Sequence, residues 1–154
     1  MEFAAVRPDD WDLALLVHLL GSFVLVGAVT LAVTSLAAAW TNGSAAMTRL
    51  AYRSLLWVAL PAWLVMRLGA QWIADEQGLL DLDEPPAWVE IGFIASEPFL
   101  LPLLIGTVLA GIGARRTRDQ TGDATKLDRW ALVLVSLALI SYLVAIWAMT
   151  TKPV

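Results

Sequence analysis

Four long apolar stretches, separated by charged segments, dominate the chain. They run over about 13–40, 54–74, 91–114 and 130–151, and the first and last contain no charged residue. Because about 20 apolar residues cross the roughly 30 Å hydrocarbon core of a bilayer, each stretch is long enough to span it. The pattern predicts an all-α fold, in which residues 1–154 form a single integral membrane domain built as a four-helix transmembrane bundle.

Composition supports a membrane protein and excludes several other classes. Hydrophobic residues make up 59% of the chain and charged residues 16%, with a mean hydropathy of +0.72. Soluble domains are typically about 45–50% apolar. The formal net charge of −4 argues against nucleic acid as a partner, because that binding needs clustered Lys and Arg. The absence of cysteine excludes disulfides, thiol catalysis and Cys-ligated metals. The expected partner of so apolar a chain is membrane lipid.

The loops differ in basic residues, which predicts the orientation. Segments 41–53 and 115–129 carry Lys and Arg, whereas 1–12 and 75–90 are acidic. By the positive-inside rule the two basic loops are cytoplasmic, so both termini are non-cytoplasmic and the chain is multi-pass in the plasma (inner) membrane. The first stretch is not expected to be a cleaved signal peptide, because its leader is acidic and its apolar run is too long. Tryptophans near span ends are expected to anchor at headgroup level: Trp11, Trp40, Trp72, Trp88, Trp130 and Trp147.

Three ionisable residues on three different spans fall at one depth in the outer half of the predicted bundle. His18 is six residues in from Asp12, Arg67 eight in from Asp75, and Glu97 seven in from Glu90. At about 1.5 Å per residue, these counts correspond to depths of roughly 9, 12 and 10 Å. Gln71 lies one helical turn outward of Arg67 and extends this polar layer.

Arg67 and Glu97 are expected to form a salt bridge. A charge that faces lipid costs about 2.5–3.5 kcal/mol even on a lenient scale, so each should point into the bundle and meet the other. A planar guanidinium holds a carboxylate with two parallel hydrogen bonds. The pair is either a structural staple between helices or part of a proton, ion or headgroup site, and the sequence leaves both open.

The segment around Glu97 predicts irregular backbone. Ser96, Glu97 and Pro98 read as a helix start, with Ser96 as the cap. The alternative is a continuous helix kinked at Pro98 and Pro102, with free carbonyls near Ile94 and Pro98. Because irregular backbone at membrane depth is tolerated only inside protein or beside a cavity, both alternatives favour a pocket near Glu97, with Ser96 beside it.

Small residues predict the packing faces. Positions 18, 21, 25, 28, 32, 35 and 39 alternate steps of three and four and read His, Gly, Leu, Ala, Ala, Ser, Ala. Such a stripe lets helices approach closely in lipid, so His18 is expected to face the bundle. A second small-residue region on the third span comprises Gly106, Ala110, Gly113 and Ala114.

The motif Leu16-Val17-His18-Leu19-Leu20-Gly21, followed by Gly27, resembles the opening helix of small bacterial four-helix membrane proteins of the copper-resistance D type and their uncharacterised relatives. The likeness covers the first helix. It implies a haem-ligand role for His18, paired in such proteins with a His on another helix. The chain has one His, so a bis-His haem would need one from each of two protomers.

Function is expected to be non-enzymatic. No P-loop, G-x-G-x-x-G, G-x-S-x-G or H-E-x-x-H motif occurs, and no metal site is expected. The leading expectation is an accessory or assembly subunit, acting with other membrane subunits or with itself, or a small binding module with a polar site of His18, Arg67, Gln71, Ser96 and Glu97. The alternatives are a proton-coupled or ion-handling transporter acting as a homo-oligomer, and a haem or quinone redox protein.

Overall fold

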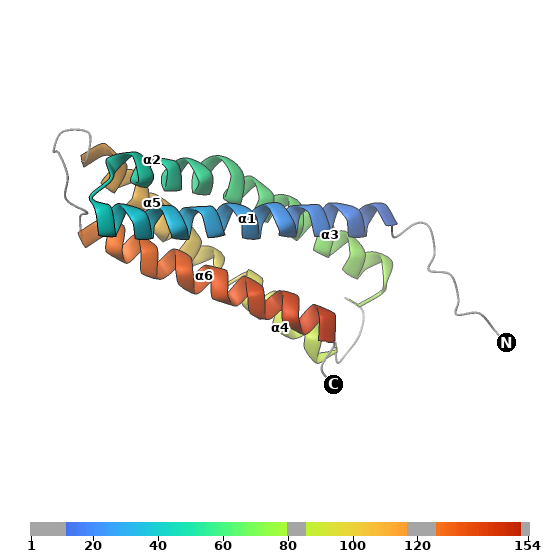
Figure 1. Ribbon diagram of the computed structural model, residues 1–154. Coiled ribbons are helices and arrows are strands. Elements are labelled where there is room, and N and C mark those ends of the chain that lie inside the picture. Colours follow the sequence, from blue (N-terminus) through green and yellow to red (C-terminus); the bar gives the residue numbers. More distant parts are fainter. Residues whose placement is uncertain (1–11, 80–85, 117–125, 152–154) are drawn as a thin grey trace.

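The computed structural model describes residues 12–79, 86–116 and 126–151, and every element in these ranges is helical (Figure 1). The helices are α1 (Asp12–Asn42), α2 (Ala45–Ser54), a π-helical turn (Leu55–Ala59), α3 (Leu60–Glu76), α4 (Ala87–Ser96), α5 (Leu100–Arg116) and α6 (Lys126–Thr151). The all-α fold predicted from the sequence is therefore confirmed.

Four helical segments are long and apolar enough to cross a membrane. They are Leu13–Asn42, Ala45–Glu76, Ala87–Arg116 and Lys126–Thr151. The second joins α2, the π-helical turn and α3 into one continuous rod, whereas the third combines α4 and α5 across a break. These four candidate spans fit the multi-pass integral membrane protein that the hydropathy pattern predicted.

The connection between the first two spans is shorter than expected. The prediction placed a loop over 41–53, but α1 ends at Asn42 and α2 begins at Ala45. Gly43 takes a φ of 63°, a left-handed conformation that glycine adopts at little cost when a helix ends. Arg49 and Arg53 consequently lie on α2, where both are exposed. The loop prediction was wrong because a long charged side chain can reach the headgroups from a helix, so basic residues do not by themselves indicate a loop.

The small-residue stripe of α1 faces the core, as predicted. The positions after His18 on the stripe are all buried: Gly21, Leu25, Ala28, Ala32, Ser35 and Ala39. α1 packs against α2, α3 and α6, and it is the central helix of the bundle. The second predicted region is buried as well, comprising Gly106, Ala110, Gly113 and Ala114. Small side chains thus set the packing of two spans.

At the crossing of α1 and α3 the backbones of two helices come into direct contact. A Cβ atom added at Gly21 would lie 2.6 Å from the Met66 backbone nitrogen, and one added at Gly69 would lie 2.7 Å from that of His18. The two glycines therefore let one backbone rest on the other. This crossing fixes His18 beside Met66. Gly69, which the sequence analysis did not single out, is as important to it as Gly21.

The π-helical turn lies directly before Pro61. The Leu60 N–H donates to the Leu55 carbonyl, five residues back, as a wider turn requires. Proline has no N–H, and its ring crowds the carbonyl four residues earlier, which here belongs to Trp57. A local π-bulge relieves that crowding while the helix continues. Nearby, the Ser54 hydroxyl donates to the Ala28 carbonyl at 2.8 Å and ties α2 to α1.

The third span breaks at Glu97, Pro98 and Phe99, and α5 begins at Leu100. The span therefore restarts, although Ser96 is not its cap: the Ser96 hydroxyl donates back to the Phe93 carbonyl at 3.3 Å. Leu100 N–H bonds to the Glu97 carbonyl, so the Ala95 and Ser96 carbonyls lose their helical donors.

Two neighbouring helices supply donors to those freed carbonyls. Ser141 Oγ of α6 donates to the Ala95 carbonyl at 2.9 Å. Trp63 Nε1 of α3 donates to the Ser96 carbonyl at 3.3 Å. Of the two carbonyls expected to be free, that of Pro98 accepts the Leu101 N–H at 3.2 Å, whereas that of Ile94 lacks its helical donor because Pro98 has no N–H. The break therefore becomes a point of attachment between helices.

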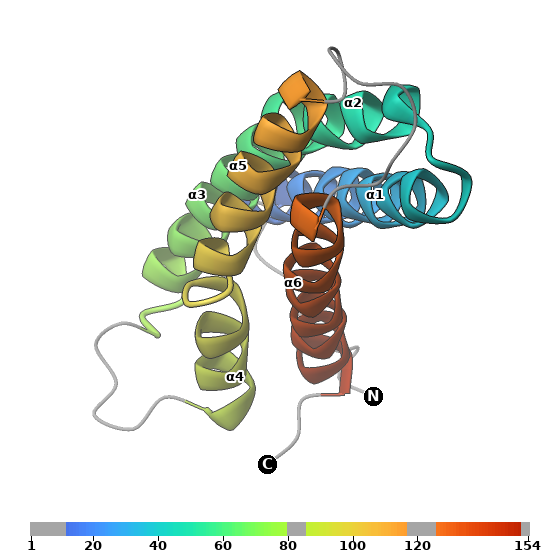
Figure 2. The ribbon, with the colours of Figure 1, turned by 90° about the vertical axis from the view of Figure 1, so that its left-hand side faces the viewer.

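The two ends of the bundle differ in charge and in packing. Figure 1 shows the α1–α2 turn, the end of α5 and the start of α6 together at one end, which carries Arg49, Arg53, Arg115 and Arg116 and is called the basic end here. The opposite end carries Asp75, Glu76 and Glu90 and is called the acidic end. Toward it, α3 packs on α1 and α4 packs on α6, and α4 stands away from α1 and α3 in Figure 2.

Candidate functional site

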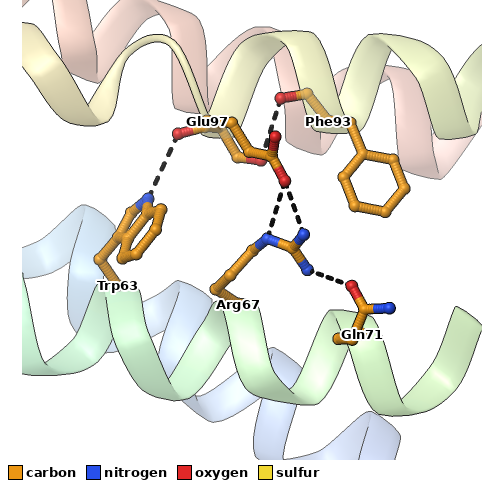
Figure 3. A network of polar contacts seen from close by, with 6 residues as sticks. Trp63, Arg67, Gln71, Phe93 and Glu97 are labelled. Atoms are coloured by element: carbon orange, nitrogen blue, oxygen red, sulfur yellow. Dashed lines mark hydrogen bonds and ion pairs between the residues drawn. The ribbon is translucent and has the colours of Figure 1, made fainter.

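Arg67 and Glu97 form the predicted salt bridge between α3 and the break after α4 (Figure 3). Arg67 Nη2 lies 2.6 Å from Glu97 Oε1, and Arg67 Nε lies 3.1 Å from the same oxygen. Because both donors converge on one oxygen, the parallel, two-oxygen arrangement expected from the sequence is not formed. Arg67 Nη1 turns instead to Gln71 Oε1, at 2.8 Å, so Gln71 belongs to this group as predicted.

An aromatic ring completes the surroundings of the guanidinium. Arg67 Cζ lies 5.0 Å from the centroid of Phe93, within the range of a cation–π contact. Phe93 also accepts the backbone N–H of Glu97 through its carbonyl, at 2.9 Å. Carboxylate, amide and aromatic face together compensate the charge of Arg67, and Figure 3 shows them gathered around it.

The ion pair occupies the gap between α3 and α4. These two helices do not pack along their length as the other neighbouring helices do, and in the described residues the gap is crossed by the salt bridge and by the Trp63 to Ser96 bond. The Arg67 side chain is 22% exposed and that of Glu97 is 49% exposed. Since lipid does not solvate a carboxylate, Glu97 depends on Arg67 and on whatever covers this face.

His18 lies at the predicted level but contacts a different partner. Its Nδ1 is 3.0 Å from the Met66 carbonyl oxygen, so the imidazole bridges α1 and α3. A carbonyl only accepts, so Nδ1 carries the proton, and Nε2 of the neutral ring is an acceptor. Among the described residues no hydrogen bond joins His18 to Arg67 or Glu97. His18 therefore lies beside the ion pair without bonding to it.

A cavity of about 500 Å³ connects His18 and Arg67 without direct contact. It lies between α1, α3, α4 and α6 toward the acidic end, and its walls are mostly apolar. Polar and sulfur-containing members of the lining include His18, Arg67, Trp88, Ser96, Tyr142 and Met149. Gln71 and Glu97 are not part of the lining, so the five predicted residues divide into three at the cavity and two behind Arg67.

Tyr142 is the member of this site that sequence reasoning missed. Its side chain is 3% exposed, and its hydroxyl has no hydrogen-bond partner among the described residues. A depth count would have found it: it lies nine residues in from Thr151, or roughly 13 Å, close to the level of Arg67. The count considered His, Arg and Glu and passed over the phenol group of Tyr142.

Trp88 also departs from expectation. It was predicted to anchor at headgroup level, yet it lines the cavity. By contrast Trp40, Trp72, Trp130 and Trp147 are exposed, as anchors would be, and Trp11 lies outside the described residues. In the described part of the chain no three His, Asp or Glu side chains converge in a way that could hold a metal ion.

No model of a protein family, no curated protein and no solved structure matches this chain. The geometry of the cavity and of the ion pair therefore carries the functional proposals that follow.

Proposed function

We propose that this protein is a small membrane-embedded binding module whose site is the cavity between α1, α3, α4 and α6. The observation that supports it is a cavity of about 500 Å³ that is largely apolar yet receives polar groups from four helices. Ligand sites of 300–1,000 Å³ with a few polar groups in apolar walls are typical of small-molecule binding. A bundle selected for packing alone would fill this space with side chains.

The Arg67–Glu97 pair has a structural part in this proposal. It bridges the gap between α3 and α4, and Arg67 lines the cavity while three of its five N–H groups donate to Glu97 and Gln71. The pair thus holds α4, which forms one wall of the cavity, in place beside α3. Buried and half-buried ion pairs are often kept for such specificity rather than for stability.

The proposed placement is the plasma (inner) membrane, with the basic end cytoplasmic and both termini outside. The basic residues that the fold gathers at one end support it. The chain has no cysteine, so single cysteines report cleanly on sidedness. In intact cells a membrane-impermeant maleimide should label Asp75→Cys and spare Asn42→Cys until the membrane is opened. The reverse pattern would overturn the orientation.

A cavity-filling variant tests the binding proposal. Ala70 lines the cavity, whereas Leu68 on the same helix is 61% exposed and lies outside it. The protein should be purified from its native membrane in a mild detergent, and the small molecules that it retains should be identified by native mass spectrometry. Wild type and Leu68→Phe should retain a molecule that Ala70→Phe loses. Equal retention of bulk lipid by all three would show that the cavity is not a binding site.

One observation favours an accessory subunit as the second candidate. The 49% exposure of Glu97 leaves part of a carboxylate uncovered in a chain that crosses a membrane, and a helix of another subunit would cover it. Co-purification from native membrane tests this candidate, with Glu90→Gln, a change at an exposed acidic residue of α4, as the control for Glu97→Gln. A stoichiometric partner lost only in Glu97→Gln would support it, and a chain that purifies alone would not.

A further inference from the structure

We infer that the cavity binds an uncharged, lipid-soluble molecule with a hydrogen-bonding ring, of the quinone or quinol class, held by the Tyr142 hydroxyl and the His18 imidazole. This inference rests on the proposed binding function and names the ligand class. It is drawn from the charge balance of the cavity and from two polar groups whose hydrogen-bonding capacity the fold leaves unused.

The charge balance favours a neutral ligand. Arg67 is the one charged residue among the described residues that line the cavity. Its charge is balanced by Glu97, which is not part of the lining. The Nε, Nη1 and Nη2 groups of Arg67 are already engaged with Glu97 and Gln71. An anionic headgroup would have only the two remaining N–H groups of Arg67 to bind, and it would place a second negative charge beside the one positive charge that Glu97 already balances. A neutral molecule faces no such cost.

Tyr142 offers a hydrogen bond that the protein does not use. Its ring forms part of the cavity wall and its hydroxyl is buried without a partner among the described residues. Leaving such a group unpaired is costly, and a ligand carbonyl oxygen would accept its hydrogen bond. The hydroxyl oxygen is covered by neighbouring atoms, so a ligand reaches it by shifting side chains. Met66 and Met149, which also line the cavity, are unbranched and adaptable.

His18 offers a complementary group from another wall. The Nδ1 proton is committed to the Met66 carbonyl at 3.0 Å, which leaves Nε2 of the neutral ring as an acceptor. The cavity therefore provides a donor on α6 and an acceptor on α1, between apolar walls. A quinone ring carries carbonyl oxygens that accept, its reduced form carries hydroxyls that donate, and its apolar tail suits the lipid phase around the bundle.

The test uses decylubiquinone, oxidised or reduced, with the protein in lipid nanodiscs and empty nanodiscs as the baseline. Tyr142→Phe removes the hydroxyl alone, and Tyr52→Phe is the matched control, because Tyr52 packs on Gly111 away from the cavity. We expect saturable binding of the oxidised probe that Tyr142→Phe weakens about tenfold and Tyr52→Phe leaves unchanged. The melting temperature of Tyr142→Phe should stay equal or rise, since an unpaired buried hydroxyl is lost.

A second variant isolates the imidazole acceptor. His18→Asn retains an amide donor for the Met66 carbonyl and removes Nε2. It should weaken the binding of the reduced probe about tenfold and weaken the binding of the oxidised probe less. Equal effects of Tyr142→Phe and Tyr52→Phe, or no saturable binding, would overturn the inference.

The two proposals fail in distinguishable ways. If native mass spectrometry finds a phospholipid that Ala70→Phe displaces, and the quinone probe does not compete with it, the binding function stands and the ligand class is wrong. If no retained molecule responds to Ala70→Phe and no probe binds, both are wrong.

Discussion

The basic and acidic halves of this bundle are closed by different means. Toward the basic end, α1, α2, α5 and α6 pack in an unbroken ring, with each helix contacting the next. Glycines allow close contacts there: the ring of Tyr52 packs on Gly111, and the side chain of Val135 packs on Gly106. Toward the acidic end the ring is open between α3 and α4, and polar side chains cross the gap.

The two tyrosines summarise that difference. Tyr52, in the closed half, packs on the backbone of another helix. Tyr142, in the open half, lines a cavity and has an unpaired hydroxyl among the described residues. Lipid provides no hydrophobic drive between helices, so packing of small residues closes a membrane bundle. Where the break after Ser96 turns α4 aside, such packing is replaced by hydrogen bonds, and space remains.

The largest effect is expected at the α1–α3 crossing, where the backbones of the two helices lie in contact. Gly21→Ala places a methyl group 2.6 Å from the Met66 backbone nitrogen, so α1 and α3 must move apart. We expect a loss of about 2 kcal/mol in the free energy of unfolding, measured by denaturing-detergent titration in mixed micelles.

Gly27→Ala is the control on the same helix. Gly27 is exposed and a Cβ there meets nothing within 4 Å. This change should leave the protein as stable or gain about 0.5–1 kcal/mol from helix propensity. Equal effects of the two alanines would mean that the crossing is not as close as described.

The next effect tests the ion pair that spans the open side. Glu97→Gln keeps an oxygen that can accept from Arg67 but removes the charge that balances it. We expect a loss of about 1–2 kcal/mol in the free energy of unfolding. Glu76→Gln, at an exposed acid bonded to Trp72, should cost less than about 0.5 kcal/mol.

A double variant sharpens this test. Combining Arg67→Gln with Glu97→Gln removes both charges, so part of the stability lost in Glu97→Gln should return. A double variant that is less stable than the wild type by the sum of the two single losses would show that the two side chains act independently.

How far the sequence predicts this molecule depends on the physical origin of each feature. The four spans, the buried stripe of α1 and the Arg67–Glu97 pair follow from the cost of exposing polar groups to lipid, which a count along the chain captures. A count along the chain does not predict the helical conformation of residues 45–53 or the role of Gly69, because both depend on how two particular helices meet.

A pocket beside Ser96 was predicted from the irregular backbone, but the position and most of the lining of the cavity were not, for a related reason. Its existence depends on the direction that α4 takes away from the break, and Ser96 could be read as a cap or as a hinge until the donors to its carbonyl were known. The membership of the site was half predicted: His18, Arg67 and Ser96 line the cavity and were predicted, and Tyr142 was not.

The smallest effect is expected at the second bridge across the open side. Trp63→Phe removes the indole N–H that donates to the Ser96 carbonyl at 3.3 Å and retains most of the ring packing. The loss in unfolding free energy should be about 0.5–1 kcal/mol. Trp57→Phe is the control, because that ring is 72% exposed.

Hydrogen exchange should also rise at the start of α5 in Trp63→Phe alone. The break would lose the bond from Trp63, while Ser141 would still donate to the Ala95 carbonyl. An unchanged exchange rate there would mean that the open half is held together by the Arg67–Glu97 pair without help from Trp63.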